Sequence, residues 1–150
     1  MKILIVDDSG TERRLLRYIV ERQGHEALEA KDGLEGLMSA KLQHPDLIIS
    51  DALMPVMDGF QFLKRVKEDE ELKSTPFVFY SAIYKADRDQ ELALSLGADA
   101  YITKPKAPTE LWRELAAIIR QPRRAATALA EADEEYLRRY SQVVAAKLEE

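Results

Sequence analysis

The first 120 positions of the chain alternate between short apolar runs and longer segments in which apolar residues recur every three or four positions. The runs are too short for helices and are typical of buried strands. The second run is the weakest, and the expected strands cover 2–6, 25–30, 47–50, 77–80 and 100–102. The segments between them have the spacing of helices with one apolar face. Strand and helix alternating five times predict an α/β fold, with a parallel sheet covered by helices on both faces.

Each expected helix has a residue suited to begin it, and these residues are Ser9, Asp32, Asp58, Asp87 and Pro108. The serine and aspartate side chains can accept hydrogen bonds from unpaired backbone N–H groups, and proline fits a first helical turn. Glu12 follows Ser9 at the spacing of a capping box. Gly24 and Gly97 are placed to end the first and fourth helices, because glycine readily adopts the left-handed conformation found there.

Apolar positions indicate which face of each helix packs on the sheet, because a helix brings residues three and four apart to one side. The pattern predicts that the first helix buries Leu15, Leu16, Ile19 and Val20. It predicts that the second helix buries Leu34, Leu37, Met38 and Leu42. In the fifth helix, the corresponding residues are Leu111, Leu115, Ile118 and Ile119.

Polar residues follow the expected strands at the points where these strands end. Asp7 and Asp8 follow the first strand, Asp51 follows the third, Ser81 ends the fourth, and Lys104 comes soon after the fifth. Right-handed crossovers place the carboxyl ends of all the parallel strands on one edge of the sheet. Ligands of open α/β sheets bind at this edge. The pattern therefore predicts that the five side chains converge on one small region.

The residue types at this edge favour phosphoryl chemistry. Asp7, Asp8 and Asp51 form a cluster of three carboxylates. Two such charges about 4 Å apart repel by about 4 kcal/mol at an effective dielectric constant of about 20, so the cluster requires a cation. Oxygen ligands favour Mg²⁺ or Mn²⁺, and a site with few protein ligands suits Mg²⁺ best. With the Lys104 ammonium and the Ser81 hydroxyl, the site could cradle a phosphoryl group, with Asp51 as nucleophile.

Composition narrows the range of functions. A length of 150 residues indicates one domain with room for a short appendage. The net charge of −5 disfavours a general nucleic-acid binder, because no basic excess is available to neutralise phosphates. The absence of cysteine excludes disulfides and thiolate metal sites. With no apolar run near the roughly 20 residues that span a bilayer and no signal peptide, we expect a soluble cytoplasmic protein without membrane contact.

Taken together and in order, these motifs resemble the receiver domain of two-component response regulators. The resemblance covers about Met1 to Arg120, and its motifs are Val6-Asp7-Asp8, Asp51 to Gly59, Ser81-Ala82 and Lys104-Pro105. It implies a flavodoxin-like, doubly wound five-stranded parallel sheet with strand order 2-1-3-4-5 and five helices. It also implies that Asp51 takes a phosphoryl group from a histidine kinase or a histidine phosphotransfer protein. Such a protein is a switch, for which we expect only self-phosphorylation from small donors and slow autodephosphorylation.

The same resemblance assigns the metal ligands. Asp8 and Asp51 would bind Mg²⁺ directly, the backbone carbonyl of Leu53 would be the third protein ligand, and Asp7 would act mainly through water. No other cofactor is implied.

The resemblance also assigns the phosphate contacts and the switch. Lys104 would pair with the phosphate across a peptide bond to Pro105 that is usually cis in this family. Ser81 would swing inward to bond a phosphoryl oxygen, and Tyr101 would turn inward behind it. A phosphoryl group adds about two negative charges and three acceptor oxygens, so it can capture a nearby hydroxyl.

The sequence departs from the family pattern in two places. Ser81 stands where the family more often has threonine, which keeps the hydroxyl and loses the methyl group that restricts its rotamer. Lys106 stands where an apolar residue is common, at the expected output face. Leu53 and Ile83 flank the expected approach of water, and neither can activate it. This predicts slow loss of the phosphoryl group.

Residues 121–150 differ in character from the preceding 120 and form a separate expected unit. The break at 121–124 is followed by a segment without glycine or proline, which favours one helix of about 20 residues or more. Its narrow apolar stripe is Leu137, Tyr140, Val144 and Leu148. The helix could pack on the receiver domain, pair with a second copy to give a homodimer, or lead into further domains of a longer protein. It lacks the internal turn of a helix-turn-helix, so direct DNA binding is disfavoured.

Two other functions remain open on the sequence alone. A phosphatase or phosphotransferase of the haloacid dehalogenase type would also form an aspartyl phosphate. Such an enzyme needs a second aspartate two residues after the nucleophile, where this chain has Leu53. A pure interaction module would keep the fold without the chemistry, and would show no Mg²⁺ dependence and no modification by acetyl phosphate or beryllofluoride.

Overall fold

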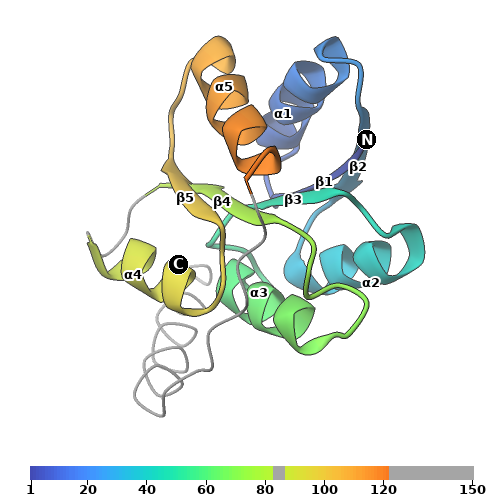
Figure 1. Cartoon of the computed structure of the whole chain (residues 1–150), viewed down its shortest axis with the longest axis vertical. Coiled ribbons are helices and arrows are strands. Elements are labelled where there is room, and N and C mark those ends of the chain that lie inside the picture. The colour runs from blue at the N-terminus through green and yellow to red at the C-terminus, as the bar shows by residue number, and fades with distance from the viewer. Residues whose placement is uncertain (83–86, 122–150) are drawn as a thin grey trace.

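The computed structural model describes residues 1–82 and 87–121, and these form a five-stranded parallel sheet flanked by helices (Figure 1). The strands are β1 (Lys2–Val6), β2 (Glu26–Ala30), β3 (Leu47–Ser50), β4 (Phe77–Ser81) and β5 (Ala100–Thr103). The helices are α1 (Gly10–Arg22), α2 (Gly33–Gln43), α3 (Gly59–Glu68), α4 (Asp87–Ser95) and α5 (Pro108–Ile119). The strand order is β2-β1-β3-β4-β5. The predicted flavodoxin-like fold is therefore confirmed.

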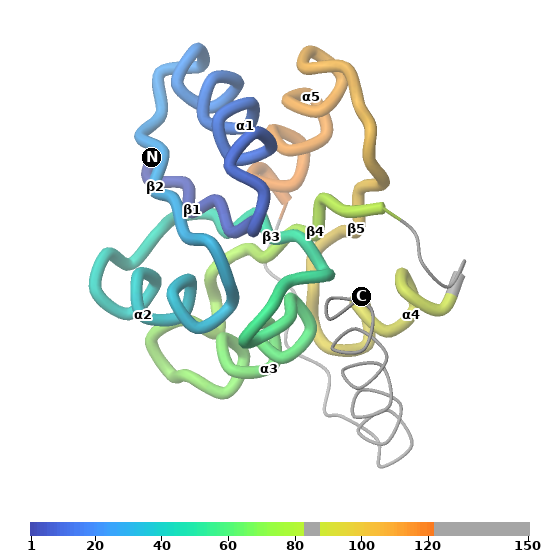
Figure 2. Tube along the Cα trace, turned by 180° about the vertical axis from the view of Figure 1, so that it is seen from behind, coloured from blue at the N-terminus to red at the C-terminus, as the bar shows by residue number. Residues whose placement is uncertain are grey.

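The helices lie in two layers, one on each face of the sheet. Helices α1 and α5 cover one face, whereas α2, α3 and α4 cover the other; Figure 2 shows these layers from behind. Successive residues of a strand point to opposite faces, so a strand between two layers must be apolar on both sides. Accordingly, Phe77 and Phe79 of β4 join the core on the α2–α3–α4 side, whereas Val78 and Tyr80 join the core on the α1–α5 side.

Ser9, Asp58 and Pro108 lie at the starts of helices as predicted, although one hydrogen bond at the start of α1 differs from the prediction. Asp58 Oδ1 accepts the N–H groups of Phe60 and Gln61, each at 2.9 Å. Pro108 is the first residue of α5. Ser9 Oγ accepts the N–H of Glu12 at 3.3 Å, as a cap should. The N–H of Ser9 donates to Asp7 Oδ1 instead of to Glu12, so the second half of the capping box is wrong.

Glycine ends two of the helices as predicted, and Asp87 is placed differently. Gly24 and Gly97 have φ angles of 83° and 102°, the left-handed conformation expected after a helix. Asp87, the predicted cap of the fourth helix, is the first residue of α4, and the residues before it lie outside the described part of the chain.

The packing face of α2 corrects the sequence prediction. Leu34, Met38 and Leu42 are 45%, 59% and 77% exposed, so three of the four predicted core residues face outward. The buried face consists of Gly33, Gly36, Leu37 and Ala40. A Cβ atom at Gly36 would lie 3.0 to 3.2 Å from the side chains of Val6 and Phe62. Small residues let α2 approach the sheet and α3 closely, and this turns the larger apolar residues outward. Leu15 of α1 is likewise 43% exposed.

Several sequence predictions lie outside the described residues. These are the C-terminal helix with its apolar stripe and the role of Ile83. Within the residues that the structure describes, no helix combines the length and the apolar character needed to cross a bilayer.

Candidate functional site

The five side chains that were predicted to converge lie at the carboxyl edge, which is the edge of the sheet where the five parallel strands end. Asp7 and Asp8 follow β1, Asp51 follows β3, Ser81 is the last residue of β4, and Lys104 follows β5. The chain leaves β1 for β2 on one side and then returns to form β3 on the other side. The strand order therefore reverses between β1 and β3, and open α/β sheets bind ligands at the carboxyl ends of the strands beside such a reversal.

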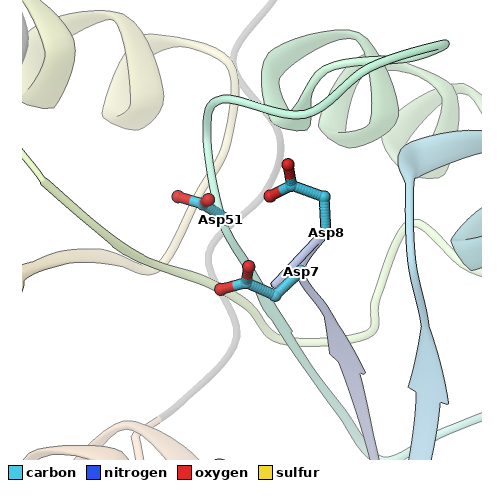
Figure 3. A group of neighbouring side chains, drawn as sticks. All are labelled: Asp7, Asp8 and Asp51. Atoms are coloured by element: carbon cyan, nitrogen blue, oxygen red, sulfur yellow. The ribbon is translucent and has the colours of Figure 1, made fainter. Parts of the chain in front are cut away.

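The three carboxylates converge above these strand ends. Figure 3 shows Asp7, Asp8 and Asp51 directed toward a common space. One oxygen atom from each lies within 4.8 Å of the other two. Asp7 and Asp51 are buried, at 2% and 8% exposure, whereas Asp8 is exposed. An all-oxygen donor set of this size with one exposed side fits Mg²⁺, which keeps several water ligands.

Burial and crowding change the acidity of the cluster. Burial raises the pKa of Asp51 to about 6; the charge of Asp7 adds to this shift, while Lys104 and two hydrogen bonds oppose it. Burial and the neighbouring Asp7 also raise the pKa of Asp8. These shifts mean that the ionised cluster is unfavourable without additional positive charge. A divalent cation would supply that charge, so the electrostatics agree with the donor set.

Hydrogen bonds fix the orientation of Asp51. Its Oδ1 accepts the backbone N–H of Ala52 at 2.9 Å and a short hydrogen bond from the Ser81 hydroxyl. Ser81 is fully buried, so this hydroxyl has few alternative partners. The N–H of Asp51 donates to the carbonyl of Val6 at 2.9 Å, which ties the end of β3 to the end of β1. The structure therefore places the Ser81 hydroxyl against Asp51.

Lys104 carries the positive charge of the site. Its Nζ donates to Asp7 Oδ2 at 2.9 Å and lies 4.0 Å from Glu12 Oε2. Burial lowers the pKa of the Lys104 ammonium, but Asp51, Asp7 and Glu12 more than compensate and raise it above its usual value. The peptide bond from Lys104 to Pro105 is cis, as the resemblance implies. The ammonium thus remains charged and lies among the carboxylates.

Tyr101 and Leu53 lie beside the site. The Tyr101 hydroxyl donates to the carbonyl of Ala82 at 2.6 Å, immediately after Ser81. The half-buried Tyr101 ring lies 5.6 Å from that of Phe79, measured between centroids. The side chain of Leu53 is half-buried and packs against the core on the α2–α3–α4 side.

The loop from Asp51 to Gly59 depends on a very close backbone approach. The N–H of Gly59 donates to the carbonyl of Ala52 at 3.0 Å. A Cβ atom at Gly59 would lie 2.2 Å from the Asp51 carbonyl oxygen and 2.7 Å from the Phe79 ring. Within the same loop, Val56 is 75% exposed and has a φ of 68°, a conformation that β-branched residues rarely adopt.

Arg13 and the second contact of Glu12 were not predicted from the sequence. Arg13 Nη1 donates to the carbonyl of Asp7 at 2.7 Å, and its Nε bonds to Glu29 at 3.2 Å, so it anchors the end of β1 to β2. Glu12 was expected only as part of a helix cap, but it also approaches Lys104. Both residues lie in the first turn of α1, and this position beside Asp7 was the available signal.

Comparison with known proteins agrees with this geometry. The family model described as "Response regulator receiver domain" matches residues 3–116. The chain is 38% identical over 120 residues to the alkaline phosphatase synthesis transcriptional regulatory protein PhoP of Bacillus subtilis, covering 80% of this chain and 49% of that protein. It is 36% identical over 103 residues to the polar-differentiation response regulator DivK of Brucella ovis, covering 69% of this chain and 83% of that protein. The chain spans about half the length of the transcriptional regulators that it matches.

Solved structures show the same architecture. The chemotaxis response regulator CheY4 of Vibrio cholerae has a TM-score of 0.73 and 33% sequence identity, covering 78% of this chain and 97% of that chain. The receiver domain of a signal transduction histidine kinase from Syntrophus aciditrophicus has a TM-score of 0.72 and 33% identity, covering 86% of this chain and 98% of that chain. Motifs, geometry and relatives agree, and the chain belongs to the response regulator receiver domain family of two-component systems.

Proposed function

We propose that Asp51 accepts a phosphoryl group from a histidine kinase or a histidine phosphotransfer protein in a Mg²⁺-dependent reaction. The observation that carries this proposal is the convergence of Asp7, Asp8 and Asp51, with Lys104 and Ser81 directed into the same region. Receiver domains bind Mg²⁺ through their aspartate cluster and interact with such kinases or phosphotransfer proteins. They act as signalling switches, which is the role we propose for this chain.

In the proposed reaction, a carboxylate oxygen of Asp51 attacks the phosphorus atom of a phosphohistidine. The P–O bond forms as the P–N bond breaks, the electron pair of that bond stays on the imidazole nitrogen, and the product is an aspartyl phosphate. The Lys104 ammonium and the Ser81 hydroxyl bind phosphoryl oxygens and stabilise the negative charge. Both groups already lie near the Asp51 carboxylate, so little reorganisation is needed.

The Mg²⁺ ligands in this proposal are Asp8, Asp51 and the backbone carbonyl of Leu53, with Asp7 acting mainly through water. When bound, the ion would neutralise charge on the carboxylates and on the phosphoryl oxygens. The raised pKa values of Asp8 and Asp51 support this assignment, because they reflect the need for a cation.

The proposed switch begins at Ser81. Its hydroxyl donates to Asp51 in the unmodified protein, and a phosphoryl group on Asp51 would draw that donor to one of its oxygens. The adjacent carbonyl of Ala82 holds the Tyr101 hydroxyl, so a shift of Ser81 changes the position of Tyr101. We propose that the face formed by β4, β5, α4 and α5 thereby changes and signals to a partner or a downstream domain.

The same proposal divides the chain at about residue 120. Helix α5 ends at Ile119, and the family match ends at residue 116, so residues 1–120 are assigned to the receiver domain. We propose that residues 121–150 connect this domain to further domains or pair with a second copy. Size-exclusion chromatography with light scattering, with and without 121–150, tests the pairing.

The test of the phosphoacceptor is intact-protein mass spectrometry after incubation with acetyl phosphate. We expect the mass of one phosphoryl group to be added only when Mg²⁺ is present. The Asp51→Asn variant should show no added phosphoryl mass. Asp46→Asn is the matched control, because Asp46 lies on the opposite edge of the sheet and Asn can still accept the N–H of Lys2. This control should be modified like the parent.

Two outcomes would contradict the proposal. One is a folded parent that gains no phosphoryl group, which would favour an interaction module. The other is an Asp51→Asn variant that is modified as fast as the parent, which would place the acceptor elsewhere.

A further inference from the structure

Tyr80 contacts both sides of the turn that carries Lys104, although no catalytic motif includes it. It lies in β4 directly before Ser81 and is 3% exposed. The Lys104 Nζ lies 5.5 Å from the centroid of the Tyr80 ring. The Tyr80 hydroxyl accepts the backbone N–H of Lys106 at 3.1 Å. One side chain therefore contacts the ammonium before Pro105 and the backbone after it.

We propose that Tyr80 is a positioning residue, which holds the Lys104 ammonium where it can bind the incoming phosphoryl group. This inference rests on the proposed function of Asp51. Tyr80 touches neither the phosphoryl donor nor the metal in this account, and acts only through Lys104.

The ring face suits this task because of the electrostatics of aromatic side chains. The π face carries partial negative charge and attracts an ammonium within about 6 Å of its centroid. The side chain of Lys104 is 17% exposed, so water weakens this attraction less than it does on the surface. The ring supplies attraction without a hydrogen bond, which leaves the three N–H donors of Lys104 available for anions.

Competition for Lys104 explains why positioning is needed. Its ammonium bonds to Asp7 at 2.9 Å and lies 4.0 Å from Glu12, so two carboxylates already attract it. A lysine side chain is long and flexible, and fixing it in one place costs rotamer entropy. The Tyr80 ring reduces this freedom in advance, because it lies beside the ammonium. Preorganisation of this kind accelerates a reaction that depends on placing charge.

Lys106 connects the turn to α5. Its Nζ bonds to Glu110 at 3.3 Å and lies 3.8 Å from Glu114, while its N–H bonds to Tyr80. The lysine that departs from the family pattern is therefore part of the support of this turn. The Tyr80 hydroxyl consequently has a local role in the turn, whereas the ring acts on Lys104.

Substitutions of Tyr80 separate the ring from the hydroxyl. The measurement is the rate of Asp51 phosphorylation against acetyl phosphate concentration at saturating Mg²⁺. Tyr80→Phe keeps the ring and should stay within about twofold of the parent. Tyr80→Met fills similar space with a flexible apolar chain and should be about five- to tenfold slower at low donor concentration. The Mg²⁺ affinity of both variants should equal that of the parent, because Lys104 is not a proposed metal ligand.

Pentafluorophenylalanine at position 80 keeps the inference testable if Tyr80→Met fails to fold. Its ring has nearly the shape of phenylalanine, but its face is no longer negative. It should be about five- to tenfold slower than Tyr80→Phe, and a residue with only a packing role would show no such difference. Tyr18→Met is the matched control. Arg22 Cζ lies 5.5 Å from the exposed ring of Tyr18 on α1, so the control removes a similar contact away from the site.

The outcomes distinguish this inference from the proposed function. A parent that is not phosphorylated would contradict the function and the inference together. A phosphorylated parent with an equally fast Tyr80→Met variant, or an equally fast pentafluorophenylalanine variant, would overturn only the role of Tyr80. Equal slowing in Tyr80→Phe and Tyr80→Met, or weaker Mg²⁺ binding in either, would also overturn it.

Discussion

The two edges of the sheet are built on opposite electrostatic principles. At the amino edge, where the strands begin, opposite polar groups pair near the surface: the N–H of Lys2 donates to the exposed Asp46 at 2.8 Å. At the carboxyl edge, Asp7 and Asp51 are buried close together beside Asp8 and share one nearby ammonium. Folding alone does not require like charges to be buried together. Carboxylates that are gathered in this way and have perturbed pKa values are typical of functional sites.

The largest expected effect concerns the backbone that brings the carboxyl edge together. Gly59→Ala should lower the free energy of unfolding by at least about 3 kcal/mol, because the new Cβ would meet the Asp51 carbonyl at 2.2 Å. Gly24, near the amino edge, has a φ of 83°, and a Cβ atom added there would have no atom within 4 Å. Gly24→Ala should therefore lower the free energy of unfolding by only about 1 kcal/mol. Urea denaturation measures both values. Equal losses would contradict the close approach at Gly59.

The second effect concerns the buried charge of Asp51. Its pKa rises from 3.8 to about 6 on folding, so the folded state holds the proton more tightly and stability falls as pH rises between these values. At about 1.4 kcal/mol per pKa unit, Asp51→Asn should stabilise the metal-free protein by up to about 3 kcal/mol at pH 7.5. The gain should vanish near pH 4, where the aspartate is protonated in the folded protein.

Asp46→Asn is the comparison at the amino edge, since Asp46 is exposed and accepts the N–H of Lys2. This variant should show no comparable gain in the free energy of unfolding between pH 4 and pH 7.5. Denaturant unfolding across this pH range measures both variants. A stabilisation by Asp51→Asn that does not depend on pH would show that repulsion is not its cause.

A third effect comes from Mg²⁺. The ion should raise the melting temperature of the parent by relieving repulsion among the carboxylates. At about ten times the dissociation constant the expected stabilisation is about 1.4 kcal/mol. Asp8→Ala should abolish this response, whereas Glu26→Ala at the amino edge should retain it. Calorimetry at constant ionic strength provides the measurement, and a persistent response in Asp8→Ala would argue against the proposed ligand set.

The smallest expected effect concerns two residues whose backbone has the left-handed conformation. Val56 near the carboxyl edge has a φ of 68°, and His44 near the amino edge has a φ of 48°. Asparagine adopts this conformation more easily than a β-branched residue does, and Val56 is 75% exposed, so little packing is lost on substitution. Val56→Asn should raise the free energy of unfolding by about 0.5 to 1 kcal/mol, and His44→Asn should raise it by less. Thermal unfolding checks the order, and a larger gain at His44 would contradict it.

The fold and the main site residues were predictable because their signals are local. Strand ends at Asp7, Asp51 and Ser81 are visible as the points where apolar runs stop. Topology rules then bring these ends together without any knowledge of side-chain positions. Asp58 and Pro108 were also predictable, because helix caps depend on neighbouring residues only.

Other features depend on contacts between elements far apart in the chain. The outward face of α2 follows from the close fit of Gly36 against Val6 and Phe62, which the periodicity of leucine and methionine does not reveal. The contact between Tyr80 and Lys106 joins positions 26 residues apart. Such pairings become visible only once the relative placement of strands and turns is known.

The most direct test of the central claim is to locate the modified residue chemically. Borohydride reduces an aspartyl phosphate to homoserine, and peptide mass spectrometry then identifies its position. After treatment with acetyl phosphate and Mg²⁺, homoserine should appear at position 51 in the parent, and it should be absent when Mg²⁺ is withheld. Homoserine at position 7 or 8, or none at all in a folded parent, would contradict the account.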